Sequence, residues 1–284
     1  MSIVRFVRII RRFFWVNEYC RIYIQRENQK YTWAKFRFEE VYDHAYDEVD
    51  TVFRGIEQAV SEIEAARASD SRYDTVKAIH DYICHTTDYD TEAYDEMHAT
   101  EEGGVLPAIT SRLASPAFGG SGAYRFVCAG YAKAFQLLCH RMDIPCVKVS
   151  GDTPVEYHAW NEVQMEDGQW YGMDVTWDDF DERSVHPLIY THFLCGSRTE
   201  TLNRFMILRK DQTDFSFAGF HQPDPSLIYI IDDKDAEVQW KILWYPPLTE
   251  EAYPLADLLR AAYEAEYPIA REGDELASDA RRRG

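Results

Sequence analysis

Cys128, His158 and Asp174 have the side-chain types, in the right order, to activate a thiol nucleophile. A thiol reacts as its thiolate, so a neighbouring base must draw off its proton. An imidazole serves as that base when a third group holds its ring in the required tautomer and orientation. The residues therefore predict a nucleophile at Cys128, a general base and acid at His158, and an orienting carboxylate at Asp174.

The segment after Cys128 predicts a helix that starts at the thiol. Apolar side chains recur with the spacing of one buried helical face at Tyr131, Ala134, Phe135, Leu138 and Met142. The helix is expected to stop at Asp143-Ile-Pro145, because proline disfavours the helical conformation in the residue before it. Cys128 then lies at the first turn, where unpaired N–H groups and the helix dipole favour the thiolate. The same N–H groups are suited to stabilising an oxyanion.

His158 and Asp174 fall in two successive predicted strands, over residues 157–163 and 170–177, joined by a turn at Asp167-Gly168. A two-residue loop would set Asp174 opposite Asn161, on the face away from His158. A three-residue loop would set Asp174 opposite Trp160, on the same face as His158. The catalytic interpretation therefore requires the three-residue loop or a bulge.

Each of these residues also has an ordinary structural interpretation. A cysteine at a helix start is often a small buried hydrophobic residue. A single histidine on a strand is often structural, and an aspartate after a strand often caps a turn. Their joint placement favours the catalytic interpretation.

Beyond this trio, the chain resembles the bacterial transglutaminase-like proteins, which share the papain-like cysteine-enzyme fold. The resemblance rests on residues 127–135, 143–146, 149–151, 158–161 and 174–179, with an upstream helix match at 78–83 and 89–90. It covers residues 74–180 densely and the flanks more faintly. It implies an α+β fold in which the nucleophile helix packs on an antiparallel β-sheet. It also implies Cys128 as nucleophile, His158 as base and acid, and Asp174 as the group that orients the imidazole.

The resemblance implies an enzyme with a Cys-His-Asp triad that acts on peptide or protein amides through a thioester. Water as the acceptor would make it a peptidase or deamidase, and a lysine amine would make it a transglutaminase. Hydrolysis is slightly favoured, because water needs no second binding site. The alternative is a catalytically weak or inactive module that binds a peptide in its groove.

The predicted substrate-binding residues are Trp160, Phe118 and Gly130. Trp160 shares the predicted face of His158, and Gly130 leaves little bulk beside the sulfur. Phe118 marks a departure from the family, whose members often have tyrosine in an Ala-Tyr-Gly stretch. If that phenol helps to bind the oxyanion or the substrate, Phe118 lacks the hydroxyl to do so; the other interpretation is a packed aromatic side chain.

No metal or other cofactor is expected. The six cysteines include no Cys-x-x-Cys pair, so zinc is disfavoured, and disulfides stay open. Cys139 and Cys146 fall in a predicted helix and strand and are interpreted as buried thiols. The acidic run from Asp178 to Glu182 suggests calcium, which some animal transglutaminases bind, but its spacing does not match an EF-hand loop.

Composition limits the class of partner. The chain has 284 residues, of which 46% are hydrophobic, as in a globular protein. A formal net charge of -19 argues against nucleic-acid binding, which depends on Lys and Arg. A peptide or protein substrate is expected instead.

The ends of the chain bear on location and domain organisation. Arginines alternate with apolar residues before Trp15, which predicts a helix packed on the domain or lying on an anionic membrane. The segment lacks the unbroken apolar stretch of a secretory signal, and no run of eighteen apolar residues predicts a transmembrane segment. A cytoplasmic location is expected.

The sequence predicts three parts of the chain. Residues 1–70 contain a helix, a strand pair and a long helix. Residues 71–247 contain the catalytic core with a late hairpin, and residues 248–284 contain a helix and a mobile tail.

Overall fold

The computed structural model describes residues 16–27, 30–40, 45–99, 112–120, 124–152, 157–179, 190–199, 237–239 and 248–266. The chain forms two compact units. The smaller unit comprises residues 1–49 and 212–246, and the larger unit comprises 50–211 and 247–284. The predicted basic segment before Trp15 and the tail from residue 273 lie outside the described residues. The three-part domain division stays a prediction.

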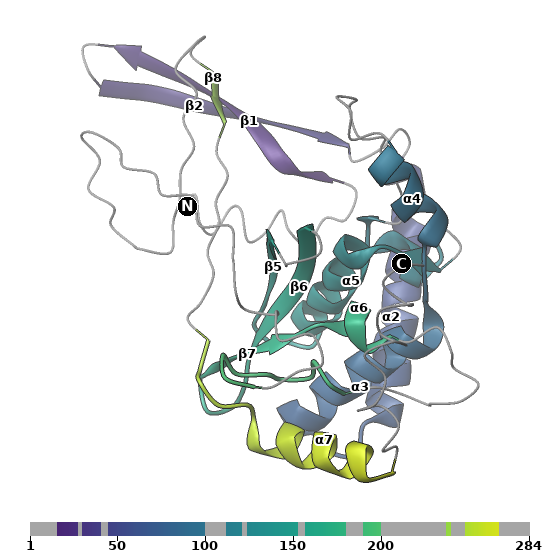
Figure 1. The fold of residues 1–284 in the computed structure, drawn as a ribbon. Coiled ribbons are helices and arrows are strands. Elements are labelled where there is room, and N and C mark those ends of the chain that lie inside the picture. The colour runs from purple at the N-terminus through teal and green to yellow at the C-terminus, as the bar shows by residue number, and fades with distance from the viewer. Residues whose placement is uncertain are drawn as a thin grey trace. The chain divides into compact units, whose positions relative to one another are not determined.

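The smaller unit contains an antiparallel sheet in the order β2-β1-β8 (Figure 1). Its strands are β1 (Val16–Glu27), β2 (Lys30–Glu40) and β8 (Glu237–Gln239). The predicted strand pair at the start of the chain is confirmed by the pairing of β1 with β2. β8 pairs with β1, and residues 227–231, the other half of the predicted late hairpin, lie outside the described residues. The short helix η1 (Ala45–Glu48) follows β2.

The larger unit contains five helices of two turns or more among its described residues, and the one that begins at Cys128 matches the predicted helical periodicity. They are α2 (Val49–Ala66), α3 (Arg72–Thr86), α4 (Thr91–Ala99), α5 (Cys128–Arg141) and α7 (Pro254–Glu266). One face of α2 is buried, through Val52, Ile56, Ala59 and Ile63. Ser71 caps α3, where its hydroxyl accepts the backbone N–H of Asp74 at 3.0 Å. The sequence analysis did not predict α4.

α5 packs on the antiparallel sheet of the larger unit, which has the order β5-β6-β7 (Figure 1). The strands are β5 (Cys146–Asp152), β6 (Tyr157–Gln164) and β7 (Trp170–Met173). Phe135 and Leu138 of the helix and Val149 and Val163 of the sheet are buried in this layer. Asn161 joins the two layers, because its side-chain amide donates to the Ala132 carbonyl at 2.9 Å. The predicted fold, a nucleophile helix packed on an antiparallel sheet, is confirmed.

The hairpin between β6 and β7 has the register that the catalytic interpretation requires. Val163 pairs with Tyr171, and the Met165 N–H donates to the Gln169 carbonyl at 3.0 Å. These pairs enclose a three-residue loop, in which Gly168 has a φ of 78°. Glycine adopts this left-handed backbone conformation without steric cost, because it has no Cβ atom. Of the two loops that the sequence left open, the structure has the three-residue loop that the catalytic interpretation requires.

β7 is shorter than predicted. It ends at Met173, and the residues expected to continue it form the single-turn helix α6 (Val175–Asp178). The physical reason is Asp174, whose side chain accepts the Trp177 N–H at 3.2 Å and so starts a helical turn. The β-branched pair Val175-Thr176 had suggested a strand, but the cap outweighs this preference.

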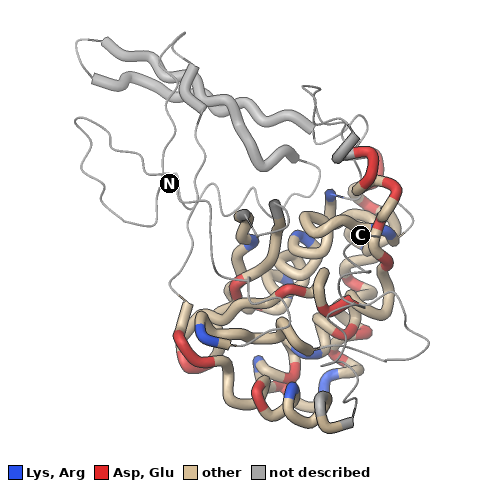
Figure 2. Tube along the Cα trace, in the orientation of Figure 1, with Lys and Arg blue, Asp and Glu red and all other residues tan. Residues whose placement is uncertain are grey.

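Shorter elements complete the larger unit. β3 (Asp88–Tyr89) pairs in parallel with β4 (Arg125–Phe126), immediately before α5. The 3-10 helix η3 (Ser115–Phe118) approaches α2 so closely that a Cβ on Gly55 would lie 2.1 Å from the Phe118 carbonyl oxygen. Acidic residues are spread over most of these elements (Figure 2). In the described part of the chain, no helix is long and apolar enough to cross a membrane.

Candidate active site

Cys128 is the first residue of α5, as predicted. The preceding N-cap residue, Val127, makes no side-chain hydrogen bond to the first turn. A valine at this position forgoes about 1 kcal/mol of capping stabilisation, so the helix start is not optimised for stability alone. Among the described cysteines, Cys128 is partly exposed, whereas Cys84, Cys139, Cys146 and Cys195 are buried. This thiol therefore combines access with the positive end of a helix dipole.

His158 pairs with Asp174 inside the protein. Its Nε2 atom lies 2.7 Å from Asp174 Oδ2, and the two side chains are 2% and 1% exposed. A carboxylate only accepts, so the hydrogen of this bond is carried by Nε2. The bond leaves the other ring nitrogen, Nδ1, as the atom that can exchange a proton with a thiol.

The surroundings of His158 favour its protonated form. Burial alone would lower its pKa, but the charge of Asp174 and hydrogen bonds with Asp174 and Cys128 outweigh burial. The pKa of His158 is raised well above its usual value. An imidazolium next to a thiol favours the thiolate, because the two opposite charges stabilise each other.

Asp174 uses its two oxygens for two tasks. Oδ1 accepts the Trp177 N–H and caps α6, while Oδ2 pairs with His158. Its own backbone N–H donates to the His192 carbonyl at 3.1 Å. Both sequence-based interpretations of Asp174, the cap and the partner of His158, therefore hold together. The cap fixes the carboxylate in the orientation that the imidazole needs.

Aromatic rings support the imidazole of His158. Trp177 stacks on it with ring centroids 4.4 Å apart and 12° between the planes. Trp160 stacks less closely, at 6.3 Å. The His192 ring contacts Trp177 edge-on, at 5.3 Å. An indole face next to an imidazolium stabilises its positive charge and restricts ring rotation.

The three residues predicted to bind substrate are all buried. Trp160 and Phe118 are each 2% exposed, and Gly130 lies on the buried side of α5. None of them offers an open surface to a substrate in this structure. Their predicted role as substrate contacts stays a prediction, and Phe118 packs as a core aromatic beside α2.

The structure adds a buried polar cluster that the sequence interpretation did not assign. His80 Nε2 lies 3.3 Å from Asp178 Oδ2, and His192 Nδ1 lies 3.0 Å from Asp178 Oδ1. The sequence signal was the spacing of Asp174 and Asp178, which puts two carboxylates one helical turn apart once α6 is recognised. His192 had no such signal, since it lies far from Asp178 in the sequence.

The aspartates considered for calcium bind protein groups instead. Asp178 contacts His80 and His192, and Asp179 accepts the hydroxyl of Tyr131. Asp181 and Glu182 lie outside the described residues. Over the described ranges, no group of three or more His, Cys, Asp or Glu side chains could hold a metal ion. The expectation that the protein works without a metal stays a prediction.

Comparison with known proteins agrees with this arrangement. Residues 58–175, which span part of α2 and all of the Cys128, His158 and Asp174 positions, match the transglutaminase-like superfamily. This part of the chain is a transglutaminase-like domain. The match begins inside α2 and ends just after Asp174.

The relatives of the domain include peptidases and a solved structure. The chain is 30% identical over 139 residues to the kyphoscoliosis peptidase of Mus musculus, and 27% identical over 139 residues to that of Homo sapiens. Each match covers 45% of this chain but 19% of the relative, so the chain spans a small part of their length. A TGase crystal structure aligns over 62% of this chain and 48% of its own, with 15% identity and a TM-score of 0.38.

Proposed function

We propose that the transglutaminase-like domain catalyses acyl transfer or hydrolysis on peptide or protein amides through a Cys128 thioester. The observation that supports this most is the buried 2.7 Å contact between His158 and Asp174, next to a partly exposed thiol at a helix start. These are the parts of an activated cysteine nucleophile. Catalysis by this trio is the proposal, and peptide or protein amides are the proposed substrate class.

The first half of the reaction forms the thioester. In the thiolate–imidazolium pair, His158 already holds the proton of Cys128, and Cys128 Sγ attacks the amide carbonyl carbon as the thiolate. Backbone N–H groups of the first α5 turn stabilise the negative oxygen of the tetrahedral intermediate. The C–N bond then breaks, and His158 returns its proton to the departing amine or ammonia. Asp174 keeps the imidazole in place and stabilises its charge without taking a proton.

The second half resolves the thioester. Water, or a lysine amine, gives a proton to His158 and attacks the thioester carbonyl. The C–S bond breaks, and the proton returns from His158 to the Cys128 sulfur. Water yields an acid, as in a peptidase or deamidase, and an amine yields a new amide, as in a transglutaminase. Hydrolysis is favoured, because water needs no second site and two relatives are described as peptidases.

The competing function is a catalytically weak or inactive peptide-binding module. The observation that favours it is the apolar Phe118 at the position where the family often has tyrosine, together with its burial. The complete Cys128, His158 and Asp174 set favours the enzyme.

The test offers a glutamine-rich protein to the chain, with and without a labelled amine. Amine incorporation identifies transamidation, while new termini or released ammonia identify hydrolysis. Cys128→Ala should remove either product. Cys139→Ala is the matched control, because Cys139 is a buried thiol later on the same helix. If wild type and Cys128→Ala behave alike over a broad substrate panel and both bind peptide, the enzyme proposal is rejected in favour of the peptide-binding module.

A further inference from the structure

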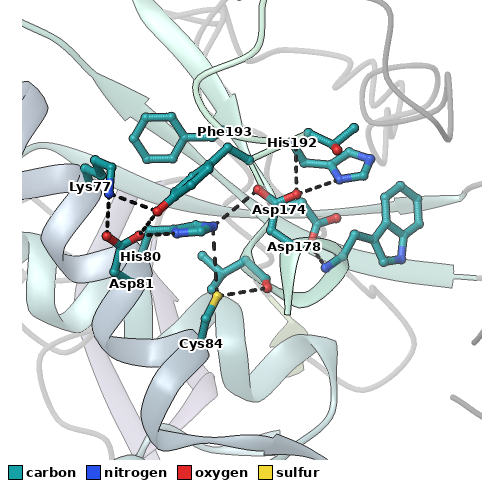
Figure 3. Close-up of polar contacts among 12 residues, drawn as sticks. Lys77, His80, Asp81, Cys84, Asp174, Asp178, His192 and Phe193 are labelled. Carbon is teal, nitrogen blue, oxygen red and sulfur yellow. Dashed lines mark hydrogen bonds and ion pairs between the residues drawn. The ribbon is translucent and has the colours of Figure 1, made fainter. Parts of the chain in front are cut away.

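A line of alternating charges leads through the larger unit to α6 (Figure 3). Lys77 Nζ lies 2.6 Å from Asp81 Oδ2, and Asp81 Oδ1 lies 3.0 Å from His80 Nδ1. The Tyr190 hydroxyl also donates to Asp81 Oδ1, at 3.0 Å. His80 then reaches Asp178 Oδ2 through its other ring nitrogen. The line starts at the partly exposed Lys77 and ends at the buried last residue of α6.

His80 is the cation at the centre of this line. Each of its ring nitrogens faces a carboxylate, and a carboxylate only accepts, so both nitrogens must carry hydrogen. Burial would lower its pKa, but the contacts with Cys84, Asp178 and Asp81 raise it well above the usual value. Burial would raise the pKa of Asp178, but His192 and His80 hold it below the usual value. Each charge is thus stabilised by its neighbours.

His192 closes a ring of hydrogen bonds around α6. Its backbone N–H donates to Asp178 Oδ1 at 2.9 Å, and its carbonyl accepts the Asp174 N–H at 3.1 Å. The Asp178 N–H in turn donates to the Asp174 carbonyl at 3.2 Å. Asp174 and Asp178 are therefore held by the same residue, at the two ends of one helical turn. A shift of Asp178 moves Asp174 with it.

α6 needs such support, because one helical turn is not stable by itself. Its four residues fix several backbone dihedrals for very few hydrogen bonds. The direction of Asp174 Oδ2 is therefore set by tertiary contacts. The contacts of Asp178 reach α3 through His80 and the segment 190–199 through His192.

We propose that Asp178 is a positioning residue for the Cys128 site, which acts with His80 and His192 to fix α6 so that Asp174 faces His158. The proposal rests on the proposed function, since it assumes that Asp174 orients His158 for the thiol. Asp178 touches neither the thiol nor a substrate in this assignment. Its effect passes through α6 to Asp174, then to the imidazole, and then to the ionisation of Cys128.

The test measures the alkylation rate of Cys128 by iodoacetamide as a function of pH, which needs no knowledge of the substrate. A thiolate paired with an imidazolium stays reactive at pH 6, where an ordinary thiol with a pKa of about 8.5 does not. Asp178→Asn should displace the acidic limb of the profile upward by about one pH unit, which lowers the rate at pH 6 about tenfold. Asp50→Asn, an exposed change on α2, is the matched control and should leave the profile unchanged.

A second variant covers the case in which Asp178→Asn does not fold. Asp81→Asn alters the partly exposed end of the line, two contacts from Asp178. It should lower the rate at pH 6 about threefold, which corresponds to half a pH unit. Its folding is checked by the thermal midpoint.

The outcomes separate the two proposals. If the wild-type profile is that of an ordinary thiol, the proposed function fails. If the wild type is reactive at pH 6 and the folded Asp178→Asn profile superimposes on it, Asp178 is only structural and the positioning role is overturned. Where Asp178→Asn does not fold, an unchanged Asp81→Asn profile overturns the role in the same way. An acidic limb displaced upward in Asp178→Asn, together with an unchanged profile in Asp50→Asn, supports the positioning role of Asp178.

Discussion

Two groups of cysteine, histidine and aspartate meet at α6, and they differ in almost everything except residue type. Asp174, at the start of the helix, pairs with His158 at 2.7 Å in the Cys128 group. Asp178, at its end, pairs with His80 at 3.3 Å in a second group with Cys84 (Figure 3). Cys84 Sγ lies 3.9 Å from His80 Nε2. Residue types alone do not tell these two groups apart.

The positions of the two thiols on their helices separate them. Cys128 is the first residue of α5, whereas Cys84 is near the end of α3, where the helix dipole disfavours a negative charge. Cys128 is partly exposed, whereas Cys84 is 3% exposed. Burial raises the pKa of Cys84 to about 11, despite the neighbouring His80. A buried thiol of this kind is chemically inert near neutral pH.

The two histidines also differ in how their ring nitrogens are used. His158 donates a hydrogen bond from Nε2 to Asp174, and its Nδ1 atom remains available to the thiol. His80 has a carboxylate at each nitrogen, so it has no site at which to accept a proton from Cys84. A base needs one unprotonated nitrogen directed at its nucleophile. The second group is therefore a structural ion-pair cluster.

The largest expected difference between the groups is in turnover. Cys128→Ala should lower kcat/KM at least about a thousandfold, because the nucleophile is lost. Cys84→Ala should change kcat/KM less than about threefold and should lower stability by about 1 kcal/mol, as expected for a small buried cavity. Steady-state kinetics and thermal unfolding of the two variants check this. A comparable loss of turnover in Cys84→Ala would break the comparison.

The reactivity of the two thiols should differ by about two orders of magnitude or more. Limiting iodoacetamide at neutral pH should modify Cys128 at least about a hundredfold faster than Cys84, because only the thiolate reacts and burial blocks access. Peptide mapping of the adducts gives the ratio. The ratio should fall close to one in denaturant, which exposes both residues. Preferential labelling of Cys84 in the native protein contradicts the assignment.

The charge of His80 predicts a pH-dependent contribution to stability. Because its pKa is raised on folding, its contribution is complete below the unfolded value of about 6.5 and is lost as pH rises through the folded value. His80→Gln should therefore lower the unfolding free energy by about 3 kcal/mol at pH 6, since it removes the cation that Asp81 and the buried Asp178 share. The difference from wild type should shrink at alkaline pH.

Denaturant unfolding at several pH values measures this effect. His85→Gln is the control, because His85 is exposed on the same helix. If the loss of unfolding free energy in His80→Gln, relative to wild type, grows as pH rises, His80 is neutral in the folded protein. That result would also remove the central cation from the line of charges.

The smallest expected effect tests the ring that supports His158. Trp177→Phe reduces the stacked surface, which stabilises an imidazolium by about 0.5–1 kcal/mol, and should lower kcat/KM about two- to fivefold. Trp170→Phe makes the same substitution in β7 and should have less effect. Steady-state kinetics of wild type and both variants on one substrate gives the ratio of their kcat/KM values. An unchanged kcat/KM in Trp177→Phe would restrict the role of this residue to packing.

Local patterns were sufficient for much of the fold and of the candidate site. The periodic apolar face after Cys128 predicted α5 and its start, because a helix face follows from residue spacing alone. The choice between hairpin loops was reduced to two registers, and the observed pairing of Val163 with Tyr171 agrees with the one that brings His158 and Asp174 together. Side-chain alternation fixes this choice once the loop length is known.

Other features depended on contacts between residues far apart in the chain. The strand predicted through Trp177 ends at Met173, because the Asp174 side chain caps α6, which in turn is held by His192. β8 joins β1 across more than two hundred residues, a pairing that no local pattern specifies. Burial of Trp160 and Phe118 likewise depends on what packs over them.

The sequence by itself determined which side chains could form a thiol site and placed Cys128 at a helix start, because the spacing of apolar residues acts within a few turns. Only the tertiary structure decided whether Asp174, the aspartate named from the sequence, in fact reaches His158, and that Asp178 faces His80, since α6 is too short to orient itself. It also decided that Cys84 is buried and Cys128 accessible. The physical reason is that burial and buried charge pairing depend on all surrounding elements, whereas helix periodicity depends only on neighbours in the chain.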